Sequence, residues 1–82
     1  MSVVQDGKVI RLEGYCRVEE AEILTALLQR SPGSTLDLAR CDGLHAAVVQ
    51  AILAFCPPLS GNPADPFLRD WLIPAMAGER QH

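Results

Sequence analysis

The first part of the chain alternates between apolar and polar positions, the pattern of a half-buried strand. In Lys8 to Glu13, Ile10 and Leu12 alternate with charged residues, and this period of two predicts a strand with one covered face. The preceding Val3 to Gln5 is a short apolar arm, and Asp6-Gly7 favours the positive φ values of a type I′ turn. A hairpin is therefore predicted, with its short first arm at a sheet edge.

A helical period follows, and then a second strand. Val18 to Arg30 has acidic residues in its first turns, where they complement the helix dipole, and Ser31-Pro32-Gly33 ends it. Ser34 to Ala39 again alternates. The order strand, helix, strand predicts a parallel βαβ unit with a right-handed crossover. The residues expected on the inward side of the helix are Ala21, Ile23, Leu24, Leu27 and Leu28.

The next helix, from about His45 to Phe55, is apolar nearly all round, with Gln50 as its only polar residue after His45. Such a helix is either covered by more protein or available to a partner. We expect Leu44, Val48, Ile52 and Phe55 to face the sheet, Val49 and Leu53 to form a flank, and Ala47, Ala51 and Ala54 to form a small-residue stripe.

The C-terminal part predicts one short strand and one more helix. Pro57-Pro58 ends the preceding helix, and Leu59 is expected in a very short further strand. Asp65 is a good N-cap before Pro66 at the first helical position, so an amphipathic helix is predicted over about residues 65–77. Its expected apolar face consists of Phe67, Leu68, Trp71, Leu72, Ala75 and Met76.

Two features of this last helix leave alternatives open. Pro74 is expected to kink it or to end its regular part near Trp71, with residues 78–82 as a frayed tail. Phe67 and Trp71 are either core residues or interface anchors, because aromatic side chains serve both purposes.

Size and composition predict one α/β domain over residues 1–82, with its core in about 3–59, a small mixed sheet and about three helices. A chain of 82 residues buries only about 60–65% of its unfolded surface. Apolar residues make up 49% of it and aromatic residues 5%. We therefore expect an aliphatic core and some apolar surface that stays exposed or meets another chain, including a possible homodimer.

Charge and cysteine usage narrow the function classes. The net charge is −3 and the chain has no basic cluster, with Lys8 as its one lysine. Nucleic acid and anionic membrane surfaces are therefore not expected as partners. No apolar run approaches the ~20 residues of a membrane span, and the N-terminus lacks the apolar region of a secretory signal. The three cysteines lack paired spacing, which favours reduced thiols in the cytoplasm.

The order of these segments resembles the STAS domain, the family that includes the bacterial anti-sigma factor antagonists. The resemblance rests on a hairpin ending in Leu12-Glu13-Gly14, a helix, a strand with Asp37-Leu38, and a loop that feeds an apolar helix. It covers roughly residues 3–56. It implies a fold that binds a regulator or kinase-like protein and carries out no enzymatic reaction, without a cofactor.

The chain departs from that family at its regulatory position. The family's loop aspartate falls on His45, and its phosphorylated serine or threonine falls on Ala46. No Ser, Thr or Tyr lies between Thr35 and Ser60, so a switch that adds about −1.5 to −2 charge there is not available. The family's final strand and helix are missing or replaced by residues 66–77. The resemblance therefore implies a reduced, non-phosphorylatable relative, truncated at its C-terminus.

The predicted partner-binding surface is the loop from Arg40 to His45 and the exposed flank of the following helix. Asp42 and His45 would give polar specificity, and Val49 and Leu53 would give apolar contact. The full set is Arg40, Cys41, Asp42, Gly43, His45, Ala46, Val49 and Leu53.

Three other chemistries are possible at the same place. The loops 14–17 and 40–45 should meet at the carboxyl edge of the sheet, where ligands usually bind. Cys16, Cys41 and His45 there would suit a metal or small ligand, or a cysteine activated by His45, although no third orienting group is evident. Asp42-Gly43 would either cradle an anion at the helix N-terminus or simply form a turn.

Overall fold

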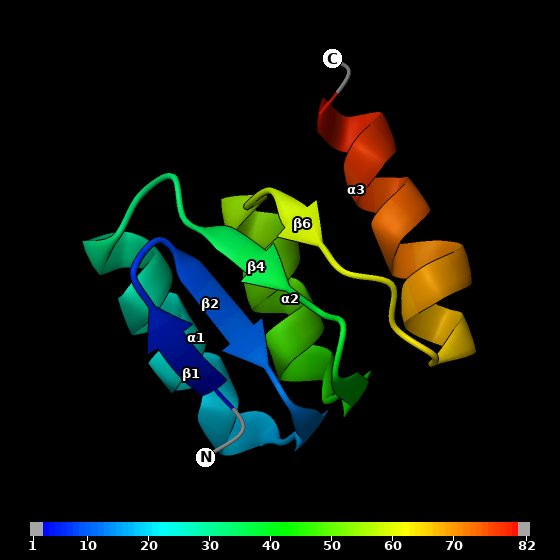
Figure 1. Cartoon of the computed structure of the whole chain (residues 1–82), viewed down its shortest axis with the longest axis horizontal. Helices are drawn as coiled ribbons and strands as arrows, with labels where there is room; N and C mark the ends of the chain where they lie inside the picture. Colours follow the sequence, from blue (N-terminus) through cyan, green and yellow to red (C-terminus); the bar gives the residue numbers. More distant parts are fainter. Residues whose placement is uncertain (1–2, 81–82) are drawn as a thin grey trace.

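The chain forms a small α/β fold with a mixed sheet and three helical segments, as Figure 1 shows for a computed structural model. The structure describes residues 3–80, and the side chains of residues 3–76. The elements follow one another as β1 (Val3–Asp6), β2 (Val9–Leu12), β3 (Gly14–Cys16), α1 (Val18–Arg30), β4 (Thr35–Asp37), β5 (Cys41–Leu44), α2 (Ala46–Phe55), β6 (Leu59–Ser60), η1 (Leu68–Leu72) and α3 (Ile73–Arg80).

Parallel pairing of β2 and β4 confirms the predicted crossover. The main sheet has the order β1-β2-β4-β6. Strand β1 lies at its edge, antiparallel to β2, while Ile10 pairs with Leu36 in the parallel ladder of β2 and β4. The short strand at Leu59 is also confirmed, because β6 pairs with β4 in parallel. Helix α1 has the predicted bounds.

The hairpin turn differs from the predicted type. Asp6 pairs with Val9, so the two central residues are Gly7 and Lys8. Gly7 has a φ of +62°, whereas Lys8 is not among the residues of positive φ. A type I′ turn needs positive φ at both central positions, and glycine at the first alone is the pattern of a type II′ turn. The prediction of type I′ was wrong because a lysine occupies the second position.

Two predicted loops are strands, which corrects the prediction for residues 14–17 and 40–45. β3 and β5 form a second, parallel ladder. Gly14, with a φ of +70°, bends the chain after β2, and its N–H donates to the Arg40 carbonyl oxygen at 2.9 Å. The pairing of β2 with β4 thus places β3 beside β5. Each segment is too short for an alternation of apolar and polar residues to be recognised in the sequence. Each forms a strand only because it pairs with the other.

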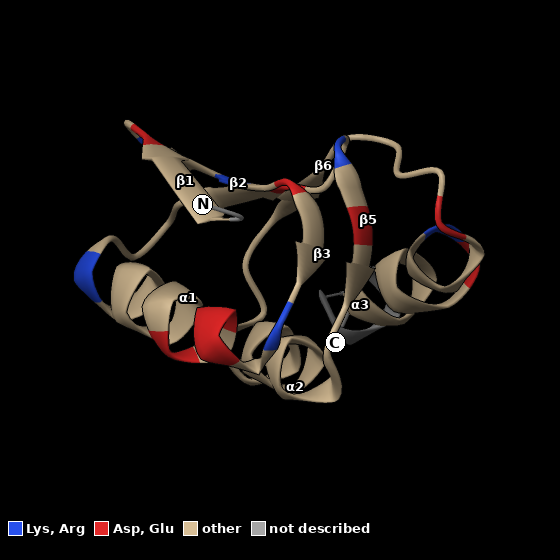
Figure 2. Cartoon of the chain, turned by 90° about the horizontal axis from the view of Figure 1, so that it is seen from below, with Lys and Arg blue, Asp and Glu red and all other residues tan. Residues whose placement is uncertain are grey.

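Helices α1 and α2 pack on one face of the main sheet, and the other face is open (Figures 1 and 2). The pairing places Val4, Arg11, Asp37 and Ser60 in one row, on the side opposite the buried Ile10. Arg11 forms ion pairs with Asp6 at 3.3 Å and with Glu13 at 3.4 Å. These pairs are partly exposed and stabilise the fold only slightly, so this face is a solvated polar surface.

The core is aliphatic, as composition indicates. It contains Val3, Ile10, Leu12, Cys16, Leu24, Leu28, Leu36, Leu38, Cys41, Val48, Ile52, Leu68, Leu72 and Met76. Two residues predicted to face inward are instead exposed. Ile23 is 37% exposed and Phe55 is 39% exposed. Ile23 belongs to the exposed stripe of α1 with Glu22 and Ala26. Phe55 is the last residue of α2, where the chain turns away through Cys56.

The C-terminal helix begins as predicted and departs from regular α geometry around Trp71, but it does not end there. Asp65 accepts the Leu68 N–H through Oδ2 at 3.1 Å, which is the expected N-cap. The helix then continues past Pro74 as α3, after the π-helical η1 in which the Ile73 N–H donates to the Leu68 carbonyl. In a regular α-helix the ring of a proline clashes with the carbonyl group four residues earlier. The π turn just before Pro74 changes the spacing of the backbone hydrogen bonds from four residues to five, and the helix continues past the proline.

The prediction of a frayed tail at residues 78–82 was wrong in part, because α3 extends to Arg80. Residues 81–82 lie outside the described part.

Three apolar side chains of the C-terminal helix, Leu68, Leu72 and Met76, are each no more than 1% exposed. The C-terminal helix therefore contributes directly to the core of its own chain. In the part that the structure describes, no helix has the length and apolar character needed to cross a membrane.

Candidate interaction surface

The start of α2 is fixed by His45, one of the predicted site residues. Its Nδ1 accepts the Ala47 N–H at 3.0 Å, which makes the imidazole the N-cap of the helix. Its own backbone N–H donates to the Cys16 carbonyl oxygen at 2.8 Å. The first residue of the helix, Ala46, is exposed. His45 thus connects β3, β5 and α2 at one corner of the molecule.

Strand β5 divides the predicted site residues between two sides. Cys41 and Gly43 are buried, whereas Asp42 is exposed. Arg40 is also exposed but precedes β5, while His45 follows it. At about 3.3 Å per residue these two lie roughly 16 Å apart along the strand. Arg40 therefore does not share a loop with His45, and Cys41 supports the surface from inside.

Tyr15 belongs to this corner and was missed from the sequence. It lies opposite Gly43 in the ladder of β3 and β5 and is 54% exposed. A Cβ atom on Gly43 would lie only 2.9 Å from Tyr15 Cδ2, so the ring covers the glycine closely. Recognition of β3 as a strand would have shown that Tyr15 points outward, because Cys16 beside it points inward.

Cys16 and Cys41 form a buried thiol pair. They come from the adjacent strands β3 and β5 and are at most 2% exposed. The neighbouring Cys41 thiol, together with burial, raises the pKa of Cys16. The Cys16 side chain lowers the pKa of Cys41, although burial opposes the effect.

The geometry does not gather the proposed metal ligands. Within residues 3–80, no group of three or more His, Cys, Asp or Glu side chains is arranged to hold a metal ion. The His45 Nδ1 atom is already engaged with Ala47, at the end of β5 away from Cys41. The metal alternative thus has no three-ligand site among these residues, while Cys16 lies beside His45 through the backbone hydrogen bond between them.

Burial predicts that the three free thiols differ in reactivity. Cys56 is only partly buried, and its thiol donates to the Leu53 carbonyl oxygen at 3.1 Å. We expect Cys56 to react first with a thiol-specific reagent in the native protein, and Cys16 and Cys41 to react only on unfolding. Peptide mapping after timed alkylation measures this. Modification of Cys41 as rapid as that of Cys56 would contradict the buried pair.

An open groove lies between α2 and the C-terminal helix. Its volume is about 440 Å³, and it is lined by Leu44, Ala46, Val49, Gln50, Leu53, Phe67 and Trp71. We call it the α2 groove. The Phe67 and Trp71 rings are stacked with their centroids 5.1 Å apart, and they are 46% and 51% exposed. Each ring thus packs partly against its own domain and leaves the rest of its surface open to solvent.

The α2 groove unites only part of the predicted set. Ala46, Val49 and Leu53 line it, whereas the remaining predicted residues do not. Phe67 and Trp71 complete its second wall. The sequence identified the aromatic pair as possible anchors but gave no sign that the pair faces the flank of α2, because this depends on how the last helix packs.

Comparison of the chain with protein-family models, with curated proteins and with solved structures finds no match. The resemblance to STAS domains therefore still rests on the order of elements and the short Asp37-Leu38 motif. A function for this chain is inferred from its own residues and their arrangement.

Proposed function

We propose that this chain is a cytoplasmic, non-enzymatic protein–protein interaction module. It is a reduced STAS-like domain of the anti-sigma factor antagonist type that works without a phosphorylation switch. The observation that carries the proposal is the exposed flank of α2. Leu53 is 36% exposed and borders an open apolar groove with Val49, on a helix that has no charged residue.

The arrangement of elements supports this assignment. The resemblance implies a hairpin, a parallel crossover, and an apolar helix that follows the second parallel strand after a loop. β1 and β2 form the hairpin, β2 and β4 are parallel, and α2 follows β4 after the short strand β5, which takes the place of the loop. Asp42 and His45 are exposed close to the start of α2. In the proposed module they supply polar specificity beside the apolar contact.

Affinity capture from a lysate of the source cells tests the proposal. We expect a regulator or kinase-like protein to be enriched about tenfold or more by the native chain, and to be lost with Val49→Asp or Leu53→Asp, because each places a charge in the apolar contact. Ala54→Asp is the matched control, since it adds the same charge to an exposed position of α2 outside the groove.

Circular dichroism of each variant confirms that the fold is retained. Failure to capture any protein whose binding depends on Val49 or Leu53 would count against the module.

A further inference from the structure

We infer that the α2 groove receives a single amphipathic helix from a partner protein, held by about three apolar side chains. This inference rests on the proposed function and adds the chemistry of the partner. Helices that lay an apolar face into a hydrophobic groove are one of the recurring modes of peptide recognition. The groove's lining, its dimensions and the charges around it each favour this occupant.

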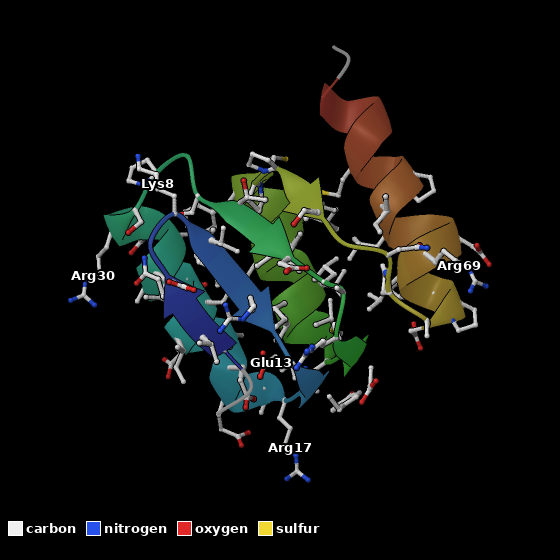
Figure 3. All side chains as sticks on the ribbon, in the orientation of Figure 1. Lys8, Glu13, Arg17, Arg30 and Arg69 are labelled. Atoms are coloured by element: carbon white, nitrogen blue, oxygen red, sulfur yellow. The ribbon has the colours of Figure 1, made fainter. Side chains whose placement is uncertain are left out.

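The lining favours an uncharged, apolar contact. Gln50 is the only polar residue among the seven that line the groove. Figure 2 shows α2 without any Lys, Arg, Asp or Glu along its length. Arg69 lies next to the aromatic wall in sequence, but its side chain points away from α2 (Figure 3) and pairs with Asp70 at 3.0 Å. Charge is thus kept outside the groove.

The dimensions match two turns of a helix. The α2 wall extends from Ala46 to Leu53, which at 1.5 Å per residue is about 10 Å. Side chains at positions i, i+4 and i+7 of a partner helix span the same length. A cavity of about 150 Å³ accommodates one benzene-sized group, so 440 Å³ holds about three such groups. Three anchors on one helix face therefore fill the groove.

A small molecule fits this groove less well. Sites for small ligands bury about 70–90% or more of the ligand surface. Here Leu53, Phe67 and Trp71 are themselves between 36% and 51% exposed, so the groove is a shallow channel between two walls. One side of any occupant stays in water, which suits the polar face of an amphipathic helix.

A second copy of this chain also fits less well. A standard interface takes about 800 Å² and roughly 20–30 residues from each partner, whereas seven residues line this groove on a protein of 4826 Å². The outer side of α1 carries the exposed Glu19 and Glu22, which would be desolvated in an apolar channel at a large cost. Helix α2 of the second copy is not considered as the occupant, because α2 forms one wall of the same groove in each copy.

Trp71 is the only tryptophan of the chain, so its fluorescence reports directly on the groove. The probe comes from a displayed library of tryptophan-free helical peptides of about 15 residues, randomised on one face. We expect enriched clones to carry apolar residues at i, i+4 and i+7. The synthesised peptide should shift Trp71 emission to shorter wavelength. Its affinity should fall about tenfold or more for Leu53→Glu and stay unchanged for Ala54→Glu.

The outcomes separate this inference from the proposed function. Peptides that bind Leu53→Glu as well as the native chain, but are lost with His45→Ala or Asp42→Ala, would overturn the groove and leave the module intact. If no clone is enriched, the inference that the groove binds a helix is overturned. If, in addition, no partner is captured from the lysate, the proposed function is overturned as well. Concentration-dependent dimers that Leu53→Glu dissociates in sedimentation would make a second copy the occupant and overturn the inference.

Discussion

Replacement of Gly61 by alanine is expected to reduce the free energy of unfolding by about 2–5 kcal/mol. Gly61 has a φ of +86°, which strains any residue that has a Cβ. A Cβ there would also lie 2.5 Å from the Ala39 nitrogen and 2.6 Å from Asp37 Oδ1. A domain of this size is stable by only about 4–12 kcal/mol, so the substitution removes a large share of its stability.

The wall that the new methyl group meets cannot move aside easily. The Ala39 N–H donates to Asp37 Oδ1 at 2.9 Å, so the two obstructing atoms hold each other in place. The Leu38 N–H donates to the Ser60 carbonyl oxygen at 2.9 Å, which keeps β6 and its following turn close to β4. Relief of the clash would therefore break a hydrogen bond of the sheet or of the turn after β4.

Gly33→Ala is the matched control for this experiment. Gly33 has the same φ of +86°, but nothing lies within 4 Å of the position that a Cβ atom would take there. We expect it to lose only about 1–2 kcal/mol through backbone strain, so the difference between the two variants measures the clash. Urea denaturation of both variants provides the comparison. Equal losses would show that the turn after β6 is looser than the contacts indicate.

The helices and strands in which apolar residues recur at a regular spacing were predictable from the sequence. α1 was predicted with its bounds because acidic residues, a leucine stripe and a Ser-Pro-Gly stop all agree locally. The alternation around Ile10 and Leu36 gave β2 and β4, and the helix between them required the parallel pairing. The N-cap at Asp65 was also readable, since the relevant bonds lie within a few residues.

The site was less predictable because its parts depend on long-range packing. β3 and β5 contain Gly14 and Gly43, which are typical of loops, and they become strands only because β2 and β4 bring them together. Arg40 was therefore placed with His45 although β5 separates them. The exposed position of Tyr15 and the approach of Phe67 and Trp71 to α2 arise from the same tertiary arrangement, which no local period encodes.

Replacement of Leu72 by alanine is expected to cost about 2–5 kcal/mol, because its side chain is fully buried. Phe67→Ala is the control from the same helix. Phe67 is 46% exposed, so we expect Phe67→Ala to cost less than Leu72→Ala.

Urea denaturation of each variant is followed by Trp71 fluorescence and by far-ultraviolet circular dichroism. Coincident transitions are expected, since Leu68, Leu72 and Met76 belong to the common core. A fluorescence transition that precedes the loss of helicity would mean that the C-terminal helix detaches separately, and that the α2 groove has only one permanent wall.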